Sequence, residues 1–163
     1  MTKKPTKYYS TKQEKAIADY LGWSPVPASG ARLFDKGDVK SADWLAECKT
    51  HTEPKDKIVI KKEVWTKLSF EAKSLMRSPI LCINNGTQRI NNTWVVIPKR
   101  LYSGNGEFTD ITCIESDKSF SFSHARAQSV FTINNIYELS INNESLLLMK
   151  IEHFKSAFYG GDN

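Results

Sequence analysis

The chain has 163 residues, of which 40% are hydrophobic and 25% charged, and this composition excludes a largely disordered protein. No apolar run is long enough to span a bilayer, and the N-terminus lacks the apolar region of a secretory signal. We therefore expect a single soluble domain that stays in the cytoplasm of its cell or host and has no membrane partner.

The net charge of +5 is unevenly distributed along the chain. Residues 1–80 contain 16 Lys and Arg against 10 Asp and Glu, whereas residues 81–163 contain 7 against 8. A basic surplus in one half is expected of a protein that binds a phosphate backbone, although a solvated basic surface has the same composition. The three cysteines, Cys48, Cys82 and Cys113, are odd in number and widely spaced, which indicates small core residues rather than disulfides or a zinc site.

The first predicted element is a helix. Residues 1–9 are basic and aperiodic, which predicts a flexible arm. Residues 10–13 match a capping box, so we expect the helix to run over 10–21 and to stop at Gly22. Glu14 shares a face with the apolar residues of this helix, so it is either a site residue or an edge glutamate that reaches solvent.

The remaining elements alternate strands with helices. A β-hairpin is expected over residues 38–51, a helix over 61–76 with apolar residues at helical spacing, and a last helix over 144–158 capped by Asn143. The predicted strands are 79–83, which should be central and buried, 93–97, 108–115, 120–123 and 129–133. Residues 58–60 are either a short strand or the entry to the helix. The pattern predicts an α/β fold with a mixed central β-sheet flanked by helices, and an additional β-rich C-terminal part.

The candidate catalytic and metal-binding residues lie within residues 37–50. In a strand, Glu47 and Lys49 project to one face and Cys48 to the other, and Asp38 from the preceding segment can complete the cluster. Two carboxylates suit Mg²⁺, and a lysine beside them can orient or deprotonate water and offset charge on a phosphate. The set predicts metal-assisted phosphodiester hydrolysis, although Glu-x-Lys also occurs on solvated strands.

Other chemistries lack their motifs. The chain contains no glycine-rich dinucleotide fingerprint, no phosphate-binding loop and no nucleophile elbow, so we expect no nucleotide cofactor and no serine hydrolase.

The order of these segments resembles the PD-(D/E)xK nuclease superfamily and, within it, the archaeal and phage Holliday junction resolvases. The helix with Glu14, the loop 27–31, the run 36–39 and the run 47–50 carry the resemblance, which covers about residues 10–83. It implies a restriction-endonuclease-like fold, a homodimer, and cutting of branched DNA with Mg²⁺, for which Mn²⁺ would substitute. The cellular setting would be the cytoplasm of a prokaryote or of a phage-infected host.

The resemblance also implies roles for single residues. Asp38 and Glu47 match the metal-binding carboxylates of the superfamily, and Lys49 matches its catalytic lysine. Glu14 matches a helix-borne glutamate that supports the metal site, and Ser29 matches a loop serine near the scissile strand.

Further site residues follow from the same assignment. The backbone carbonyl of Cys48 would complete the metal ligands. Candidate phosphate contacts are Arg32, Lys36, Lys61 and Lys62.

Two departures from the superfamily pattern leave one ligand open. In the superfamily pattern a proline precedes the aspartate. Here Gly37 precedes Asp38, and Val39 follows it. Asp43 is a second acidic residue in the gap, with the strand parity of Glu47, and could replace Asp38, although Gly37-Asp38-Val39 fits the pattern better.

Residues 84–163 match nothing in the superfamily and are interpreted as an extension of the same domain. Two other functions remain open. One is a PD-(D/E)xK nuclease of restriction, repair or DNA-processing type that acts on linear or flapped DNA. The other is a non-catalytic DNA-binding module whose carboxylates are structural.

Overall fold

The computed structural model describes residues 4–27 and 36–160 of the chain. Its helices are α1 (Thr6–Leu21), α2 (Lys62–Ser74), α3 (His124–Val130) and α4 (Ile151–Tyr159), with 3₁₀ turns η1 (Ile90–Asn92) and η2 (Lys99–Leu101). Its strands are β1 (Ser24–Pro25), β2 (Val39–Lys40), β3 (Trp44–Thr50), β4 (Lys57–Lys61), β5 (Ser78–Asn84), β6 (Thr93–Pro98), β7 (Glu107–Phe108), β8 (Cys113–Glu115), β9 (Ser119–Ser123), β10 (Asn135–Ile141) and β11 (Glu144–Lys150). Within these ranges, none of the helices has the length and apolar character needed to cross a membrane.

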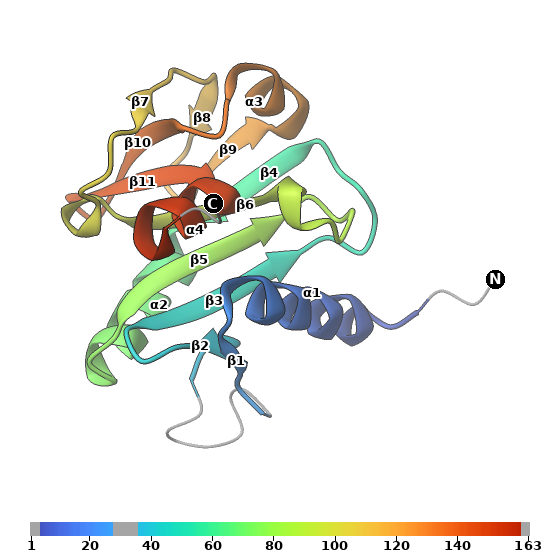
Figure 1. Cartoon of the computed structure of the whole chain (residues 1–163). Coiled ribbons are helices and arrows are strands. Elements are labelled where there is room, and N and C mark those ends of the chain that lie inside the picture. Colours follow the sequence, from blue (N-terminus) through green and yellow to red (C-terminus); the bar gives the residue numbers. More distant parts are fainter. Residues whose placement is uncertain (1–3, 28–35, 161–163) are drawn as a thin grey trace.

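Strands from both halves of the chain form one central sheet (Figure 1). Its eight strands lie in the order β1-β2-β3-β5-β6-β11-β10-β7, and a smaller sheet has the order β4-β9-β8. The central sheet is mixed, because β3 pairs parallel with β5 and β10 pairs parallel with β7. Helices α1 and α4 pack on one face and α2 on the other. The predicted mixed central sheet flanked by helices is confirmed.

Strand β3 lies between an antiparallel and a parallel neighbour. β2 pairs with it antiparallel, with Val39 opposite Ala46, and β5 pairs with it parallel, with Glu47 opposite Leu81. Parallel strands need a crossover connection, and here β4 and α2 provide it. The crossover therefore brings β4 close to the face of β3 that carries the candidate chemistry.

Alternation along β3 divides its buried residues between two cores. Leu45 packs in one cluster with Trp65 of α2. Cys48 packs in the other with Ile17 of α1 and Phe154 of α4. Because successive side chains of a strand point to opposite faces, the charged residues on either side of Cys48 share the face of Leu45.

Several predicted elements are confirmed with small shifts of their ends. These are the hairpin over residues 38–51, the helix over 61–76 and the strands over 79–83, 93–97 and 120–123. Residues 58–60 belong to strand β4 rather than to the helix entry. Cys48 and Cys82 are buried, free thiols, as expected for core residues, whereas Cys113 is half-buried.

The predicted helix start at Ser10 is wrong. Helix α1 begins at Thr6, after Pro5, so residues 6–9 of the predicted flexible arm are helical. The Ser10 hydroxyl donates to the Thr6 carbonyl within the helix instead of capping it. Proline lacks an N–H and has a fixed φ that suits the entry of a helix, which explains the earlier start. The predicted stop at Gly22 is confirmed, with a left-handed φ of 71°.

The predicted helix over residues 144–158 is wrong in its first half, which forms strand β11. Asn143, predicted as a helix cap, has a φ of 63°, and Asn142 has a φ of 54°. Together they form the two-residue turn of a hairpin between β10 and β11. The apolar run of β11 is buried along most of its length, and a fully buried strand shows no period that distinguishes it from a helix.

The strand predicted over residues 129–133 is also wrong, because α3 extends to Val130. The hydroxyl of Ser123 accepts the N–H of Arg126, and the carboxylate of Asp56 accepts the N–H of Ala125 at 2.7 Å. These bonds stabilise the first turn of α3. Asp56 is far away in the chain, so local sequence does not reveal it. Strand β10 was not predicted, and of the segment 108–115 only the two ends are strands.

Substitution of Gly37 tests whether the backbone that leads into β2 requires a glycine. It has a φ of +74°, and a Cβ there would lie 2.7 Å from Leu45 Cδ1. Gly22 has a φ of +71° but open space around the same position. We expect Gly22→Ala to lower the free energy of unfolding by about 1–2 kcal/mol through backbone strain alone. Gly37→Ala should lose about 1–3 kcal/mol more through overpacking against Leu45.

Denaturant unfolding of the two variants beside the wild type measures this difference. Equal losses would show that Leu45 moves aside freely and that Gly37 is required only for its φ.

Candidate active site

Asp38 is positioned by the backbone of β3. Its N–H donates to the carbonyl of Ala46 at 2.8 Å, and its Oδ2 accepts the N–H of Cys48 at 2.8 Å. Asp38 lies in a bend directly before β2, so Asp38 and Val39 both stand next to Ala46 and the paired register of the two strands begins only at Val39. One backbone hydrogen bond and one carboxylate hydrogen bond therefore hold Asp38 beside β3.

Glu47 and Lys49 form an ion pair on one face of β3. Lys49 Nζ lies 2.6 Å from Glu47 Oε1, with 50% of the lysine side chain and 21% of the glutamate side chain exposed. Burial acts to lower the pKa of Lys49, but the hydrogen bond and charge of Glu47, with the charge of Asp38, outweigh it. The pKa of Lys49 is thus raised, and the side chain is a cation at neutral pH.

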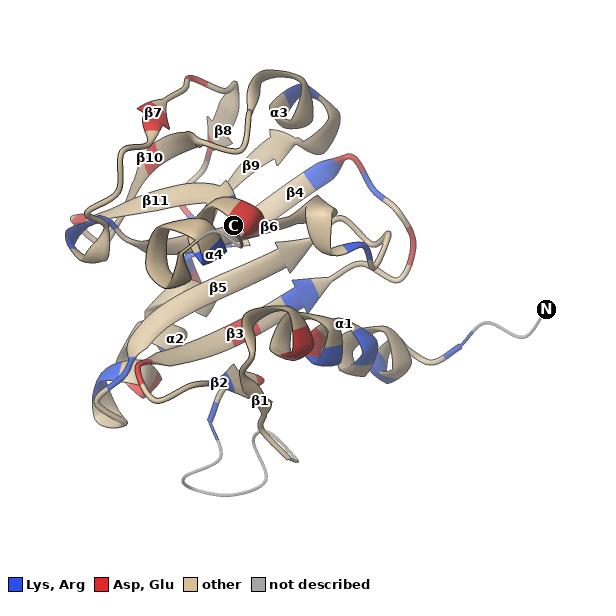
Figure 2. Ribbon diagram, in the orientation of Figure 1, with Lys and Arg blue, Asp and Glu red and all other residues tan. Residues whose placement is uncertain are grey.

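Glu14 projects from α1 toward the same charges. Its pKa is raised, first by burial and then by the negative charges of Asp38 and Glu47, while Lys49 and Lys7 offset part of this effect. Figure 2 shows acidic and basic positions close together on α1 and on the neighbouring part of β3. Asp38 and Glu47 therefore disfavour a negative charge on Glu14, and a bound cation would relieve that repulsion.

Cys48 contributes its backbone rather than its thiol. The N–H of Cys48 points to Asp38, and in an extended strand the C=O of a residue points to the same edge as its N–H. The carbonyl is thus directed toward the carboxylate cluster. The thiol lies on the opposite face beside Cys82, where the hydrogen bond with Cys82 and burial raise its pKa well above the ordinary value.

The donor set fits a hard divalent cation. Asp38, Glu47 and the Cys48 carbonyl offer only oxygen atoms, which Mg²⁺ and Mn²⁺ prefer. Over residues 4–27 and 36–160, no three His, Cys, Asp or Glu side chains are already gathered as a metal cluster. Any cation would therefore rely on the carbonyl and on water as well as on the two carboxylates.

Asp43 lies apart from this cluster. It occupies the turn between β2 and β3, where its N–H donates to the Ser41 hydroxyl. Four residues along an extended strand separate it from Glu47 by about 13 Å. Asp38, and not Asp43, therefore lies beside the part of β3 that carries Glu47 and Lys49.

The candidate phosphate contacts fall in different places. Lys36 is half-exposed and lies directly before Gly37. Ser29 and Arg32, like residues 1–3 of the predicted arm, lie outside the described residues.

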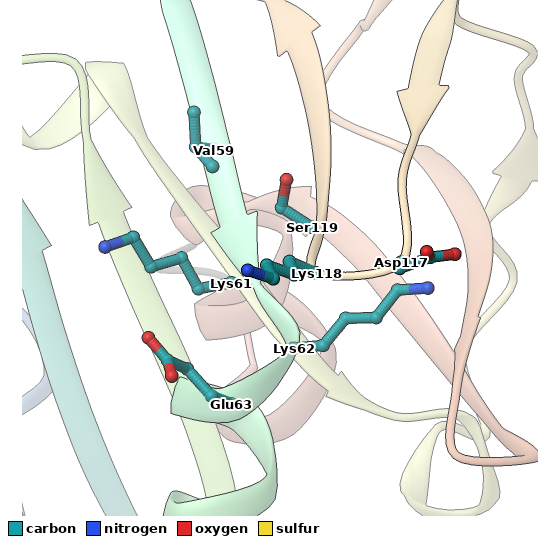
Figure 3. Close-up of a pocket in the computed structure, with 7 residues that line it drawn as sticks. All are labelled: Val59, Lys61, Lys62, Glu63, Asp117, Lys118 and Ser119. Carbon is teal, nitrogen blue, oxygen red and sulfur yellow. The ribbon is translucent and has the colours of Figure 1, made fainter.

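Lys61 and Lys62 point in opposite directions from the end of β4 (Figure 3). The Lys62 ammonium lies 2.8 Å from Glu115 Oε1 and over the ring of Phe120. Lys61 instead lines a pocket of about 350 Å³ that Lys49 also lines. The structure therefore brings Lys61, and not Lys62, together with the candidate catalytic lysine.

Gln13 is a site residue that the sequence did not reveal. It is buried, and its Nε2 donates to the backbone carbonyl of Lys49 at 3.0 Å. This bond ties α1 to the end of β3 and so sets the distance between Glu14 and Lys49. Gln13 lies four residues before Ile17 and shares its buried face, a spacing that could have identified it.

Glu14 generates a pH-dependent stability prediction. A raised pKa in the fold means that the protonated carboxyl stabilises the protein below the ordinary carboxyl pKa, and that this contribution is lost as the pH rises through the raised value. At pH 7 without divalent metal, we expect Glu14→Gln to unfold at a higher denaturant concentration than the wild type. The advantage should disappear below a pH of about 4.

Glu107→Gln is the matched control, because it removes the same charge from an exposed position on β7. A Glu14→Gln variant that is less stable than the wild type at pH 7 would contradict the repulsion.

Comparisons of the chain with protein-family models, with curated proteins and with solved structures found no match. We therefore infer the function from the positions of Glu14, Asp38, Glu47 and Lys49 and from the sequence resemblance.

Proposed function

We propose that the protein is a metal-dependent endonuclease that hydrolyses DNA phosphodiester bonds and prefers branched DNA, above all four-way junctions. The observation that carries this proposal is the convergence of Glu14, Asp38, Glu47 and Lys49 from α1, the entry to β2, and β3. A mixed sheet flanked by helices is the fold that the PD-(D/E)xK resemblance implies, and it supports the restriction-endonuclease-like assignment.

Each residue has a distinct task in this proposal. Asp38, Glu47 and the Cys48 carbonyl would hold Mg²⁺ or Mn²⁺, with Glu14 supporting them. When bound, such an ion polarises the phosphate and lowers the pKa of water. Lys49 would orient or activate the attacking water and offset charge on the phosphate. Glu47 holds the ammonium in place.

The choice of branched DNA comes from the sequence resemblance and from the basic surplus of the N-terminal half. A symmetric homodimer would present two such sites to opposing strands of a four-way junction. A nuclease of restriction, repair or processing type shares the site chemistry and differs only in the DNA that it cuts.

A non-catalytic DNA-binding module fits the charges less well. Glu14, Asp38 and Glu47 add negative charge to this part of the protein, and that charge repels a phosphate backbone unless a cation intervenes. A binder gains nothing from this arrangement.

Cleavage assays test the proposal. A labelled four-way junction should be cut with Mg²⁺ and not with EDTA, and a linear duplex of the same sequence should be cut more slowly. Lys49→Ala and Glu47→Ala should each reduce the rate by about 10²–10⁴-fold, because each removes a group that acts in the transition state. Lys73→Ala, at an exposed position near the end of α2, should leave the rate unchanged.

Equal cutting of both DNAs would retain the nuclease site and move the substrate to linear or flapped DNA. Full activity in both Lys49→Ala and Glu47→Ala would overturn the proposal. Binding without any cutting would favour the non-catalytic module.

Metal affinity separates the two candidate aspartates. Asp38→Asn keeps an oxygen that accepts the Cys48 N–H but removes the charge. Loss of an outer-shell partner of a metal site alone costs about 10–100-fold in affinity, so loss of a ligand should weaken Mn²⁺ binding at least about tenfold. Asp43→Asn should bind Mn²⁺ like the wild type. Calorimetric titration with Mn²⁺ checks both, and the reverse order would make Asp43 the ligand.

A further inference from the structure

A pocket with an apolar floor opens beside Lys49, on the face of β3 opposite α1. Its volume is about 350 Å³. Leu81 and Ile83 of β5 form its buried part, and the half-exposed Val59 of β4 and Val64 of α2 form its wall. Such a pocket is large enough for a small organic ligand. None of the residues that form this floor takes part in the proposed phosphodiester chemistry.

Two lysines stand at the rim of this pocket. Lys49 reaches it from β3, and Lys61 reaches it from the end of β4. Lys61 forms no ion pair within the described ranges, in contrast to Lys62, which is paired with Glu115. An apolar floor between two ammonium groups is complementary to a ligand that has a flat apolar body and negative charge at its edge. A nucleotide has both properties.

The groove continues past Lys61. A neighbouring pocket of about 470 Å³ is also lined by Val59 and Lys61, and it extends to Lys118 in the turn between β8 and β9 (Figure 3). Glu63 and Asp117 line this second pocket, so it is less basic than the first. A DNA strand that enters at Lys49 therefore has a path across β4 and over the small sheet.

From this arrangement we propose that the pocket binds one unpaired nucleotide of the DNA strand that is cut, next to the scissile phosphate. The base would lie on Val59, Val64 and the β5 side chains, and the backbone would pass the ammonium groups of Lys49 and Lys61. This inference rests on the proposed nuclease function and deepens it, because it identifies the DNA feature that the site selects.

The physical reason for selectivity is the cost of exposing a base. In a continuous duplex a base must be unpaired and unstacked before it enters a pocket, and this step has a free-energy cost. At a branch, a flap or a mismatch that cost is lower, because the base is already partly released. The pocket therefore favours DNA with an unpaired base next to the cut.

The test measures binding without cutting. Fluorescence anisotropy with Ca²⁺ in place of Mg²⁺ compares a duplex that contains one unpaired adenine with the same duplex fully paired. The wild type should bind the first duplex on the order of tenfold more tightly, which corresponds to about 1.4 kcal/mol. Val59→Phe should abolish this preference by filling the pocket.

Lys57→Phe is the matched control, since it places the same ring on the same face of β4 but outside the pocket. It should keep the preference. Lys61→Ala against Lys57→Ala forms a second pair that does not depend on the folding of Val59→Phe. Only Lys61→Ala should reduce the preference, because only Lys61 lines the pocket.

Equal binding of the two duplexes by the wild type would overturn the proposal, as would an unchanged preference in Val59→Phe and Lys61→Ala. Its failure is distinguishable from failure of the nuclease function. Metal-dependent cutting without a binding preference would overturn only the proposal that the pocket binds a nucleotide. A binding preference without cutting would overturn only the proposal that the protein is a nuclease.

Discussion

The register of β3 between its two neighbours is the constraint on which the candidate site depends. Pairing with β2 and β5 directs Cys48 toward α1 and α4, and it directs Leu45, Glu47 and Lys49 toward the side of α2 and β4. Because the side-chain period of a strand is two, a slip of one residue would exchange these faces. Glu47 and Lys49 would then enter the core beneath α1, and their burial would cost several kcal/mol for each charge. Two apolar cores therefore enforce the orientation of two polar residues.

The charges of the candidate site destabilise the folded chain. Glu14 is half-buried, and burial together with the charges of Asp38 and Glu47 raises its pKa. A neutral side chain at position 14 would avoid this repulsion. Groups whose pKa is shifted by burial and by specific charged neighbours are concentrated in functional sites. The repulsion is thus a physical reason to regard the cluster as a candidate functional site rather than as an ordinary solvated surface.

The crossover between β3 and β5 has two structural consequences. It permits the parallel pairing of these strands, and it brings β4 and the start of α2 beside the end of β3. Val59, Lys61 and Val64 come from this crossover and form one side of the pocket next to Lys49. The small sheet formed by β4, β9 and β8 then supports that side, with Ile58 and Phe122 in the core below it. Residues from the second half of the chain therefore stabilise the surroundings of a site whose chemistry lies in the first half.

Local patterns predicted the elements with a clear period. Helix α2 has apolar residues at helical spacing, and β5 is a short apolar run after a break, so both were identified with small errors at their ends. The errors occur where a distant partner or a special backbone conformation decides. Asp56 stabilises the start of α3 from 69 residues away, and the turn at Asn142 and Asn143 directs the next residues into β11. Neither effect produces a hydrophobic period.

The chemical groups of the candidate site and their alternation on β3 are encoded locally. Glu47 and Lys49 are two residues apart in an apolar strand pattern, and that spacing requires a shared face whatever the rest of the fold does.

The surroundings of that pair depend on how distant elements pack together. This packing brought Gln13 to the carbonyl of Lys49 across 36 residues, separated Asp43 from the cluster, and turned Lys61 toward Lys49 while Lys62 turned away to Glu115. The physical reason is that local periodicity specifies the direction of a side chain relative to its own element. The distances between elements depend on how the two cores pack, which no short segment encodes.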